Sequence, residues 1–317
     1  MSARRIFFLA SFCLGISLGF VLPAYSRNEL VKIETVKGTY SNALQATNNS
    51  RMPVTVTLQL SSFSNLTSSK RWPIQAQLTG GQSMELVQIS AENAQFGYTI
   101  DYSSQFVQGD PNARHDANVS YQIPFVAGQG FQILQAADGP QFTHQSVATR
   151  YAVDIDMPMG TTVVAARAGY VVEVVSQFAD NGKTEAEFFD KANYVRILHD
   201  DGTWADYFHL MQNSSQVQSG VRVEAGHVLA LSGNSGYSAT PHLHFHVQVN
   251  QNGTIISLPF RFRNSHDGVF TPRYQSWLIP DTQTVNASKT KARKTLRECL
   301  PGGKAVDDAV IRCLSAS

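Results

Sequence analysis

The sequence predicts an all-β protein: a β-sandwich-like domain, then a second domain rich in β-sheet, then a short helical C-terminal tail. Two observations carry this prediction. Short runs in which apolar and polar residues alternate recur along the chain, as half-buried strands require. No long run with helical spacing occurs among the strand-like runs of the second domain. With 317 residues, the chain is long enough for two domains.

The N-terminus has the layout of a secretory signal peptide. Arg4 and Arg5 precede an apolar run over residues 6–22, and the small residues Ala24 and Ser26 follow it. We expect cleavage after Ser26, which would leave no stable membrane span. The alternative is an uncleaved anchor helix, because the apolar run is almost long enough to cross a bilayer.

The composition is that of a soluble globular protein, with 43% hydrophobic and 15% charged residues. The formal net charge is +1, so no general electrostatic attraction to nucleic acid is expected. Cys299 and Cys313 remain after signal cleavage. In an oxidising compartment these two residues can form a disulfide that closes a short C-terminal loop.

The first domain is expected to span residues 27–125, after the signal segment 1–26. Its run "VTVTLQL" at 54–60 alternates apolar and polar residues, and "FGYTIDY" at 96–102 repeats the pattern. Polar loops separate these runs, which predicts a small sandwich. No catalytic constellation occurs there, so both a binding or spacing role and a purely structural role stay open.

The second domain is expected to span residues 126–265. A long polar insertion at 178–192 interrupts it and is expected on the surface. The remaining extension, residues 266–317, carries the predicted short helix near 305–314. The strand-like runs of the second domain, separated by Gly, Asn and Asp turns, are "TTVVAARAGYVVEVV", "NYVRILH", "TWADYFHL", "HVLALSG" and "HLHFHVQV".

The stretch "TPHLHFHV" at 240–247 holds three of the nine histidines of the chain. In a strand, His242, His244 and His246 share one face, while the apolar residues between them share the other. Imidazole is a common metal ligand, and a strand fixes its direction, so this face suits a metal or catalysis. The alternative is a half-exposed strand that carries polar histidines with no further role.

A catalytic zinc site needs three protein ligands and one open position. The same domain offers Asp154 and Asp156 in "VDID", His144 in "FTHQS" and His209 in "DYFHL". His199 and His227 fit better as core histidines with satisfied hydrogen bonds. Asp156 is a candidate partner that would orient a ligand histidine.

Four motifs occur in an order that resembles the lysostaphin-type (LytM-domain) zinc metalloendopeptidases. The resemblance covers about residues 126–250 and is far more specific than two histidines one residue apart. The motifs are "DIDMPMGTTVVAARAGYV", "NYVRILHDDGTWADYFHL", "VQSGVRVEAGHVLALSG" and "GHVLALSGNSGYSATPHLHFHV".

The resemblance implies a β-sheet core, one zinc ion and hydrolysis of peptide bonds in bacterial peptidoglycan. By position, Asp154 and His244 match zinc ligands, and His209 and His242 match catalytic histidines. With the signal peptide, this implies an exported protein, periplasmic or extracellular in a bacterium. The "SGNSGYSATP" turn is expected to bring tight backbone close to the substrate.

Two positions depart from the pattern of the family. Its first ligand is a histidine four residues before the aspartate, but Arg150 stands there and cannot bind zinc. His144, ten residues before Asp154, is the expected substitute. The second departure is His246, where the family often has glutamate, and we interpret it as a residue beside a ligand or along the substrate groove.

Three alternative functions are also compatible with parts of the sequence. A catalytically inactive LytM-type relative that binds the wall or activates another wall hydrolase is favoured by Arg150 and opposed by the four other histidines. A cupin-like metal protein would need a carboxylate shortly after the His-x-His pair, where the chain reads "VQVNQNG". A secreted sandwich that only binds polysaccharide or wall would explain the first domain but not the histidines.

Overall fold

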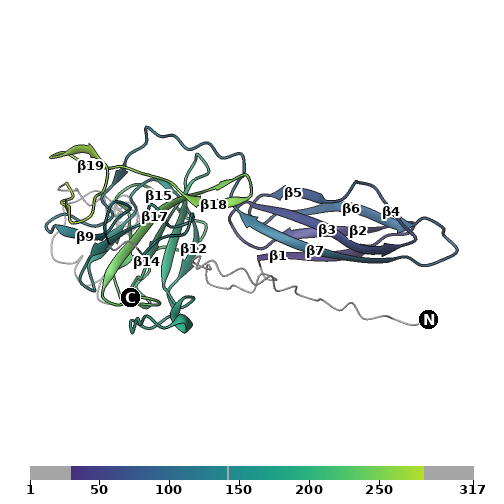
Figure 1. Cartoon of the computed structure of the whole chain (residues 1–317), viewed down its shortest axis with the longest axis horizontal. Coiled ribbons are helices and arrows are strands. Elements are labelled where there is room, and N and C mark those ends of the chain that lie inside the picture. The colour runs from purple at the N-terminus through teal and green to yellow at the C-terminus, as the bar shows by residue number, and fades with distance from the viewer. Residues whose placement is uncertain (1–29, 141–142, 282–317) are drawn as a thin grey trace, which may run out of the picture. The chain divides into compact units, whose positions relative to one another are not determined.

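The computed structural model describes residues 30–140 and 143–281, and their regular secondary structure is almost entirely β-strand. Within them, the one 3-10 helix is η1 (Ala186–Phe188), and the other named elements are strands (Figure 1). The all-β prediction is therefore confirmed. The predicted signal peptide, the Cys299–Cys313 pair and the helix near 305–314 lie outside the described residues. No helix in the described ranges is long and apolar enough to cross a membrane.

The N-terminal part forms the predicted sandwich, with two antiparallel sheets around one core. Val54, Val56 and Leu58 of the alternating run are fully buried in that core. The first sheet has the order β1 (Val31–Lys37), β2 (Asn42–Asn48), β6 (Ser83–Ala91) and β4 (Leu66–Ser68). The second has the order β5 (Ile74–Leu78), β3 (Val54–Ser64) and β7 (Thr99–Gln108).

The C-terminal part is built on a nine-stranded sheet with β17 (His242–Gln251) near its middle. β17 pairs with β14 (Trp204–Phe208), β10 (Val153–Asp156) and β18 (Thr254–Ser257), all antiparallel. The remaining strands of this sheet are β15 (Arg222–Val223), β12 (Gly169–Val175), β13 (Tyr194–Leu198), β9 (Phe131–Gln135) and β21 (Trp277–Leu278).

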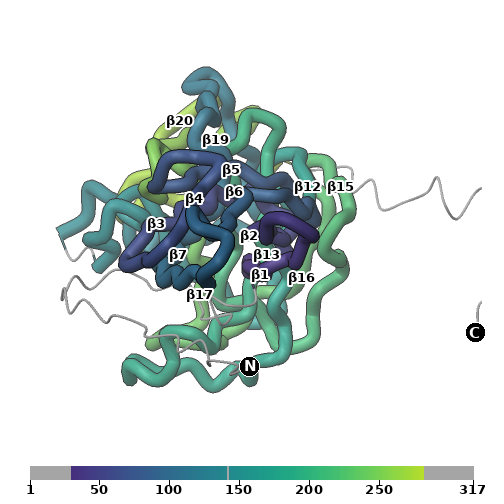
Figure 2. The backbone as a smooth tube through the Cα atoms, turned by 90° about the vertical axis from the view of Figure 1, so that its right-hand side faces the viewer, coloured from purple at the N-terminus to yellow at the C-terminus, as the bar shows by residue number. Residues whose placement is uncertain are grey.

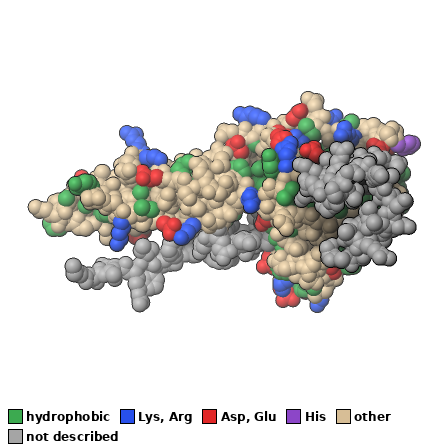
Figure 3. All heavy atoms as spheres, turned by 180° about the vertical axis from the view of Figure 1, so that it is seen from behind, with side chains coloured by type: hydrophobic (Ala, Val, Ile, Leu, Met, Phe, Trp, Pro, Cys, Tyr) green, Lys and Arg blue, Asp and Glu red, His purple; other side chains and the backbone are tan. Residues whose placement is uncertain are grey.

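Two small sheets complete this part. β11 (Thr162–Val164) pairs with β16 (Val228–Leu231). β19 (Phe262–Asn264) lies beside β20 (Gly268–Phe270), as Figure 2 shows, and also pairs with β8 (Tyr121–Gln122). On the face of the molecule in Figure 3, basic and acidic side chains are interspersed, which agrees with the low net charge.

β17 is buried along nearly its whole length, and its two faces have different chemistry. Leu243, Phe245 and Val247 are fully buried in the hydrophobic core. The ring of Phe245 meets Tyr207 and Phe260 edge-on, each at 5.1 Å between ring centres. This packed apolar face fixes the strand, so that the histidines on the other face have set directions.

Phe245→Ala should lower the free energy of unfolding by about 3–5 kcal/mol, because it leaves a cavity where three aromatic rings meet. Urea unfolding followed by fluorescence measures the change. Val269→Ala is the control, since Val269 is 52% exposed and its loss should change stability by less than about 0.5 kcal/mol. Equal effects of the two substitutions would contradict the central place of Phe245 in the core.

Candidate functional site

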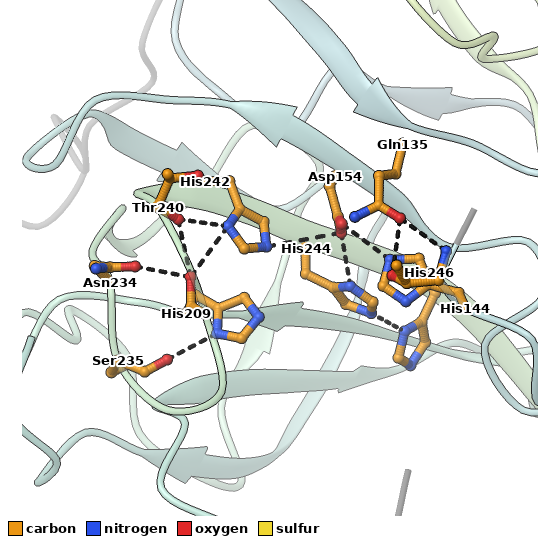
Figure 4. Close-up of polar contacts among 12 residues, drawn as sticks. Gln135, His144, Asp154, His209, Asn234, Ser235, Thr240, His242, His244 and His246 are labelled. Carbon is orange, nitrogen blue, oxygen red and sulfur yellow. Dashed lines mark hydrogen bonds and ion pairs between the residues drawn. The ribbon is translucent and has the colours of Figure 1, made fainter. Parts of the chain in front are cut away.

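The antiparallel register of β10 and β17 sets the geometry of the site. Asp154 lies directly opposite His244 in this pairing, and His144 reaches the same point from the loop that follows β9 (Figure 4). One potential ligand atom from each of these three residues lies within 4.8 Å of the others. The exposed fractions of the three residues are 4%, 2% and 5%, so the cluster is shielded from water.

The two histidines approach different oxygens of one carboxylate. His144 Nε2 lies 3.0 Å from Asp154 Oδ2, and His244 Nδ1 lies 2.8 Å from Asp154 Oδ1. Two imidazole nitrogens and a carboxylate that converge in a buried place are a donor set that suits zinc. The residues present therefore fit a zinc ion.

Electrostatics keep these groups in forms that can bind a metal. Burial alone would raise the pKa of Asp154, but attraction to His144 and hydrogen bonds with His144 and His244 hold it well below its usual value. Burial lowers the pKa of His244 to about 3. At neutral pH the site thus contains an ionised Asp154 and a neutral His244, the states in which both bind metals.

The loop that carries His144 is pinned to the sheet. Gln135 Oε1 of β9 accepts hydrogen bonds from Thr143 N at 3.0 Å and Thr143 Oγ1 at 2.8 Å, directly before His144. Gln248 Nε2 of β17 donates to Ala148 O at 2.6 Å. Arg150 lies further along this loop and is exposed. The fold therefore brings His144, and not the residue at position 150, to Asp154.

His209 begins the turn after β14, with its backbone in the left-handed region at φ 63°. This conformation is uncommon for residues other than glycine and is found more often at functional sites. His209 Nδ1 lies 2.7 Å from Ser235 O, so it donates its hydrogen to that carbonyl. Its Nε2 then carries a lone pair, and burial lowers the pKa of His209 well below its usual value.

His242 stands beside His209, with 4.6 Å between the ring centres. Its Nδ1 donates to Thr240 O at 2.7 Å, which leaves the lone pair on Nε2. That Nε2 lies 3.8 Å from Asp154 Oδ1, at the edge of the three-residue cluster (Figure 4). The two rings thus present two lone pairs next to the candidate metal ligands.

The turn "SGNSGYSATP" supplies the groups that hold these two rings. Gly236 in this turn has a φ of 77°, and a Cβ there would lie 2.6 Å from backbone atoms of Ala192. The glycine is therefore needed for the turn to pack against its neighbouring loop. The sequence offered no signal for the carbonyl partners, because every residue has a carbonyl group.

His246 is the fifth histidine of the site and lies beyond His244. Its Nδ1 is 2.8 Å from His244 Nε2, and its Nε2 is 3.1 Å from Asp206 Oδ2. The expectation that Asp156 orients a ligand histidine is wrong: Asp156 is exposed, and the neighbour of His244 on its outer side is His246. Gln135 and Asp206 are further polar residues of the site that the sequence analysis missed.

Comparisons with known proteins place part of this chain in a family of peptidases. Residues 148–255 match the profile of Peptidase family M23. The segment is an M23 domain. The predicted resemblance to the lysostaphin-type peptidases is thereby confirmed. Four of the five predicted site residues lie inside the matched M23 segment, and His144 lies four residues before it.

Curated relatives match less than half of the chain. Lysostaphin of Staphylococcus staphylolyticus is 30% identical over 139 residues, which are 44% of this chain and 25% of that protein. Glycyl-glycine endopeptidase ALE-1 of Staphylococcus capitis is 31% identical over 146 residues, 46% of this chain and 34% of that protein. The chain thus spans about a quarter to a third of these relatives.

Among solved structures, the catalytic domain of lysostaphin from Staphylococcus simulans is similar. The match has 25% identity and a TM-score of 0.27, and it covers 45% of this chain and 95% of that domain.

Two histidines away from the site were expected in the core. His199 is there: it is 2% exposed, and its Nδ1 donates to Ala168 O at 2.8 Å. His227 is exposed, so that expectation was wrong. Burial lowers the pKa of His199 to about 4, and its Nε2 has no hydrogen-bond partner among the described residues.

The buried His199 should make stability depend on pH. Its pKa is about 6.5 when unfolded and about 4 when folded, so the unfolded chain takes up the proton first as pH falls. The free energy of unfolding should therefore drop by roughly 3 kcal/mol between about pH 6.5 and 4 from this residue.

His199→Gln should remove this part of the pH dependence, measured by urea unfolding at several pH values. His266→Gln is the control, because the His266 side chain is 82% exposed. A His199→Gln chain that loses stability with pH as steeply as the original would show that His199 is not held neutral by the fold.

Proposed function

We propose that the protein is a zinc-dependent endopeptidase that hydrolyses peptide bonds in the stems or cross-links of bacterial peptidoglycan. The observation that carries this proposal is the meeting of His144, Asp154 and His244 in a buried cluster, beside the paired rings of His209 and His242. The M23 domain and the glycyl-glycine endopeptidase among the relatives support peptide hydrolysis. An exported location follows from the substrate.

In this proposal His144, Asp154 and His244 hold one zinc ion. When bound, zinc supplies Lewis-acid polarisation of the peptide carbonyl and activation of a water molecule. The fixed charge of Asp154 and the two imidazoles give the ion a site whose ligands already converge, so little reorganisation is needed on binding.

His209 and His242 handle protons and hydrogen bonds in the proposed reaction. Each holds its Nδ1 hydrogen on a backbone carbonyl and keeps a lone pair on Nε2. One of these nitrogens takes a proton from the attacking water and passes it to the leaving amine. A proton taken up from solvent at Nε2 of the other ring lets that ring donate a hydrogen bond to the developing oxyanion, and this proton returns to solvent when the products leave. The carbonyls of Ser235 and Thr240 prevent the rings from turning away.

Asp154→Asn should reduce bound zinc from about one equivalent to under about 0.1, because it removes the charged ligand at the centre of the cluster. Metal analysis after gel filtration measures this. Asp156→Asn is the control on the same strand, since Asp156 is exposed, and it should keep its zinc. Equal zinc in both variants would refute the proposed ligand set.

Alanine at position 209 or 242 should lower the rate of muropeptide release from purified sacculi by about 10²–10⁴-fold while zinc stays bound. His244→Ala should lose both zinc and release. The masses of the released fragments would name the bond. A folded chain that binds zinc and releases nothing from sacculi would instead favour the inactive, wall-binding or activating relative.

The domain division at 27–125, 126–265 and 266–317 is part of the proposal. At its two boundaries, β8 (Tyr121–Gln122), β20 and β21 pair with strands of the second segment, so the chain on either side of that segment contributes to its sheets. The M23 match falls within the second of these segments, and the N-terminal sandwich has a hydrophobic core of its own. Its role in binding or spacing can be tested by comparing release from sacculi with and without residues 30–108.

A further inference from the structure

We propose that His246, Asp206 and Arg196 form a hydrogen-bonded relay that favours hydrogen on Nε2 of His244 and so makes the lone pair of its Nδ1 available to the metal. His246 and Asp206 are positioning residues in this scheme. The inference rests on the proposed zinc site. It assigns a role to a buried charged pair that the reaction itself does not use.

The relay follows from counting donors and acceptors. An ionised carboxylate only accepts, so His246 Nε2, 3.1 Å from Asp206 Oδ2, must carry hydrogen. In a neutral ring, His246 Nδ1 then holds a lone pair and accepts from His244 Nε2, 2.8 Å away. Without a cation, the ionised Asp154 accepts from His244 Nδ1, 2.8 Å from its Oδ1, and so opposes this arrangement. Once a metal ion pairs with Asp154, His244 keeps its hydrogen on Nε2 and offers the lone pair of Nδ1. In the metal-loaded protein, one carboxylate, that of Asp206, thus sets two tautomers in sequence.

Arg196 keeps that carboxylate ionised. Its Nε and Nη2 donate to the two oxygens of Asp206 at 2.7 and 3.1 Å. Both residues are almost completely buried, at 1% and 0% exposed. Burial alone would raise the pKa of Asp206, but Arg196 and the hydrogen bond with His246 lower it to about 2. The remaining Nη1 of Arg196 donates to Glu173 and Gln108.

The strand register explains why these groups line up. Arg196 of β13 lies opposite Asp206 of β14, and Asp206 lies opposite His246 of β17. His246 and His244 are two residues apart and so share a face. The Phe208 ring lies 5.8 Å from both imidazoles and helps to exclude water from them. Three neighbouring strands therefore carry a continuous row of charge and hydrogen bonds to the ligand.

This arrangement differs from the usual support of a metal ligand. A ligand histidine commonly donates its outer N–H directly to a carboxylate, a carbonyl or water. Here a second imidazole stands between the ligand and the carboxylate. Because imidazole has two possible tautomers, His246 can orient His244 only if a fixed charge orients His246, and Asp206 with Arg196 supplies that charge.

Asp206→Asn tests whether the negative charge of Asp206 sets the tautomer of His246. An amide can present either a donor or an acceptor, so it no longer dictates the tautomer of His246. Zinc affinity, measured by competition with a chromophoric chelator, should fall about 10–100-fold. The matched control is Asp200→Asn: Asp200 also makes a bidentate pair with an arginine, Arg222, but its side chain is 67% exposed. This control should leave zinc affinity within about twofold.

Two substitutions at position 246 separate the effect of its hydrogen bonds from the effect of its side-chain packing. His246→Gln can accept from His244 with its oxygen and donate to Asp206 with its amide nitrogen, so it should keep zinc affinity within about threefold. His246→Leu fills similar space without an acceptor and should lose at least as much affinity as Asp206→Asn. Circular dichroism and thermal unfolding identify any variant that fails to fold.

The tautomers are read directly from long-range ¹H–¹⁵N NMR spectra of the zinc-loaded original chain. We expect hydrogen on Nε2 of both His244 and His246. A chain that binds zinc with His246 protonated only at Nδ1 overturns the relay alone, as does an Asp206→Asn chain with unchanged affinity. A folded original chain that binds no zinc overturns the metal site and the relay together.

Discussion

The site depends on burying a carboxylate inside a β-sheet. Asp154 is 4% exposed, and an isolated buried carboxylate would be very costly. The register of β10 against β17 offsets this cost by placing His244 opposite Asp154, and the loop held by Gln135 and Gln248 adds His144. A slip of one residue in this pairing would turn the histidines into the apolar core. The fold and the site are therefore fixed by the same strand pairing.

β17 serves both requirements because its side chains alternate. Its apolar face, centred on Phe245, belongs to the hydrophobic core, and its histidine face is saturated with polar partners. Every ring on that face is held by a neighbour at hydrogen-bond distance: Asp154, Asp206, or the carbonyl of Thr240. A polar face of this kind tolerates burial only when such networks are complete.

The sequence predicted the strand pattern and the residues that meet, but not what holds them. Period two in "HLHFHV" was enough to predict the two faces of β17, and the motif order identified Asp154 and His209. The orienting carbonyls leave no trace in a sequence, because they depend on backbone position. Asp206 is 40 residues from His246, and only its place inside the apolar run "WADYF" indicated a buried partner. Asp156, chosen because it neighbours Asp154, lies at the exposed strand end.

The two buried carboxylates of the polar face, Asp206 and Asp154, differ in their charged partners. Asp206 is neutralised by Arg196, whose further contact with Glu173 leaves that outer group of three with one negative charge shared toward solvent. Asp154 has no arginine or lysine among its hydrogen-bond and ion-pair partners in the described part of the chain; those partners are imidazoles. Metal binding requires both imidazoles to be neutral, and with the one carboxylate they then carry a charge of −1, which a divalent cation would change to +1. The buried carboxylate therefore attracts positive charge to the place where the ring nitrogens of His144 and His244 meet it, and a proton and a metal compete for that place.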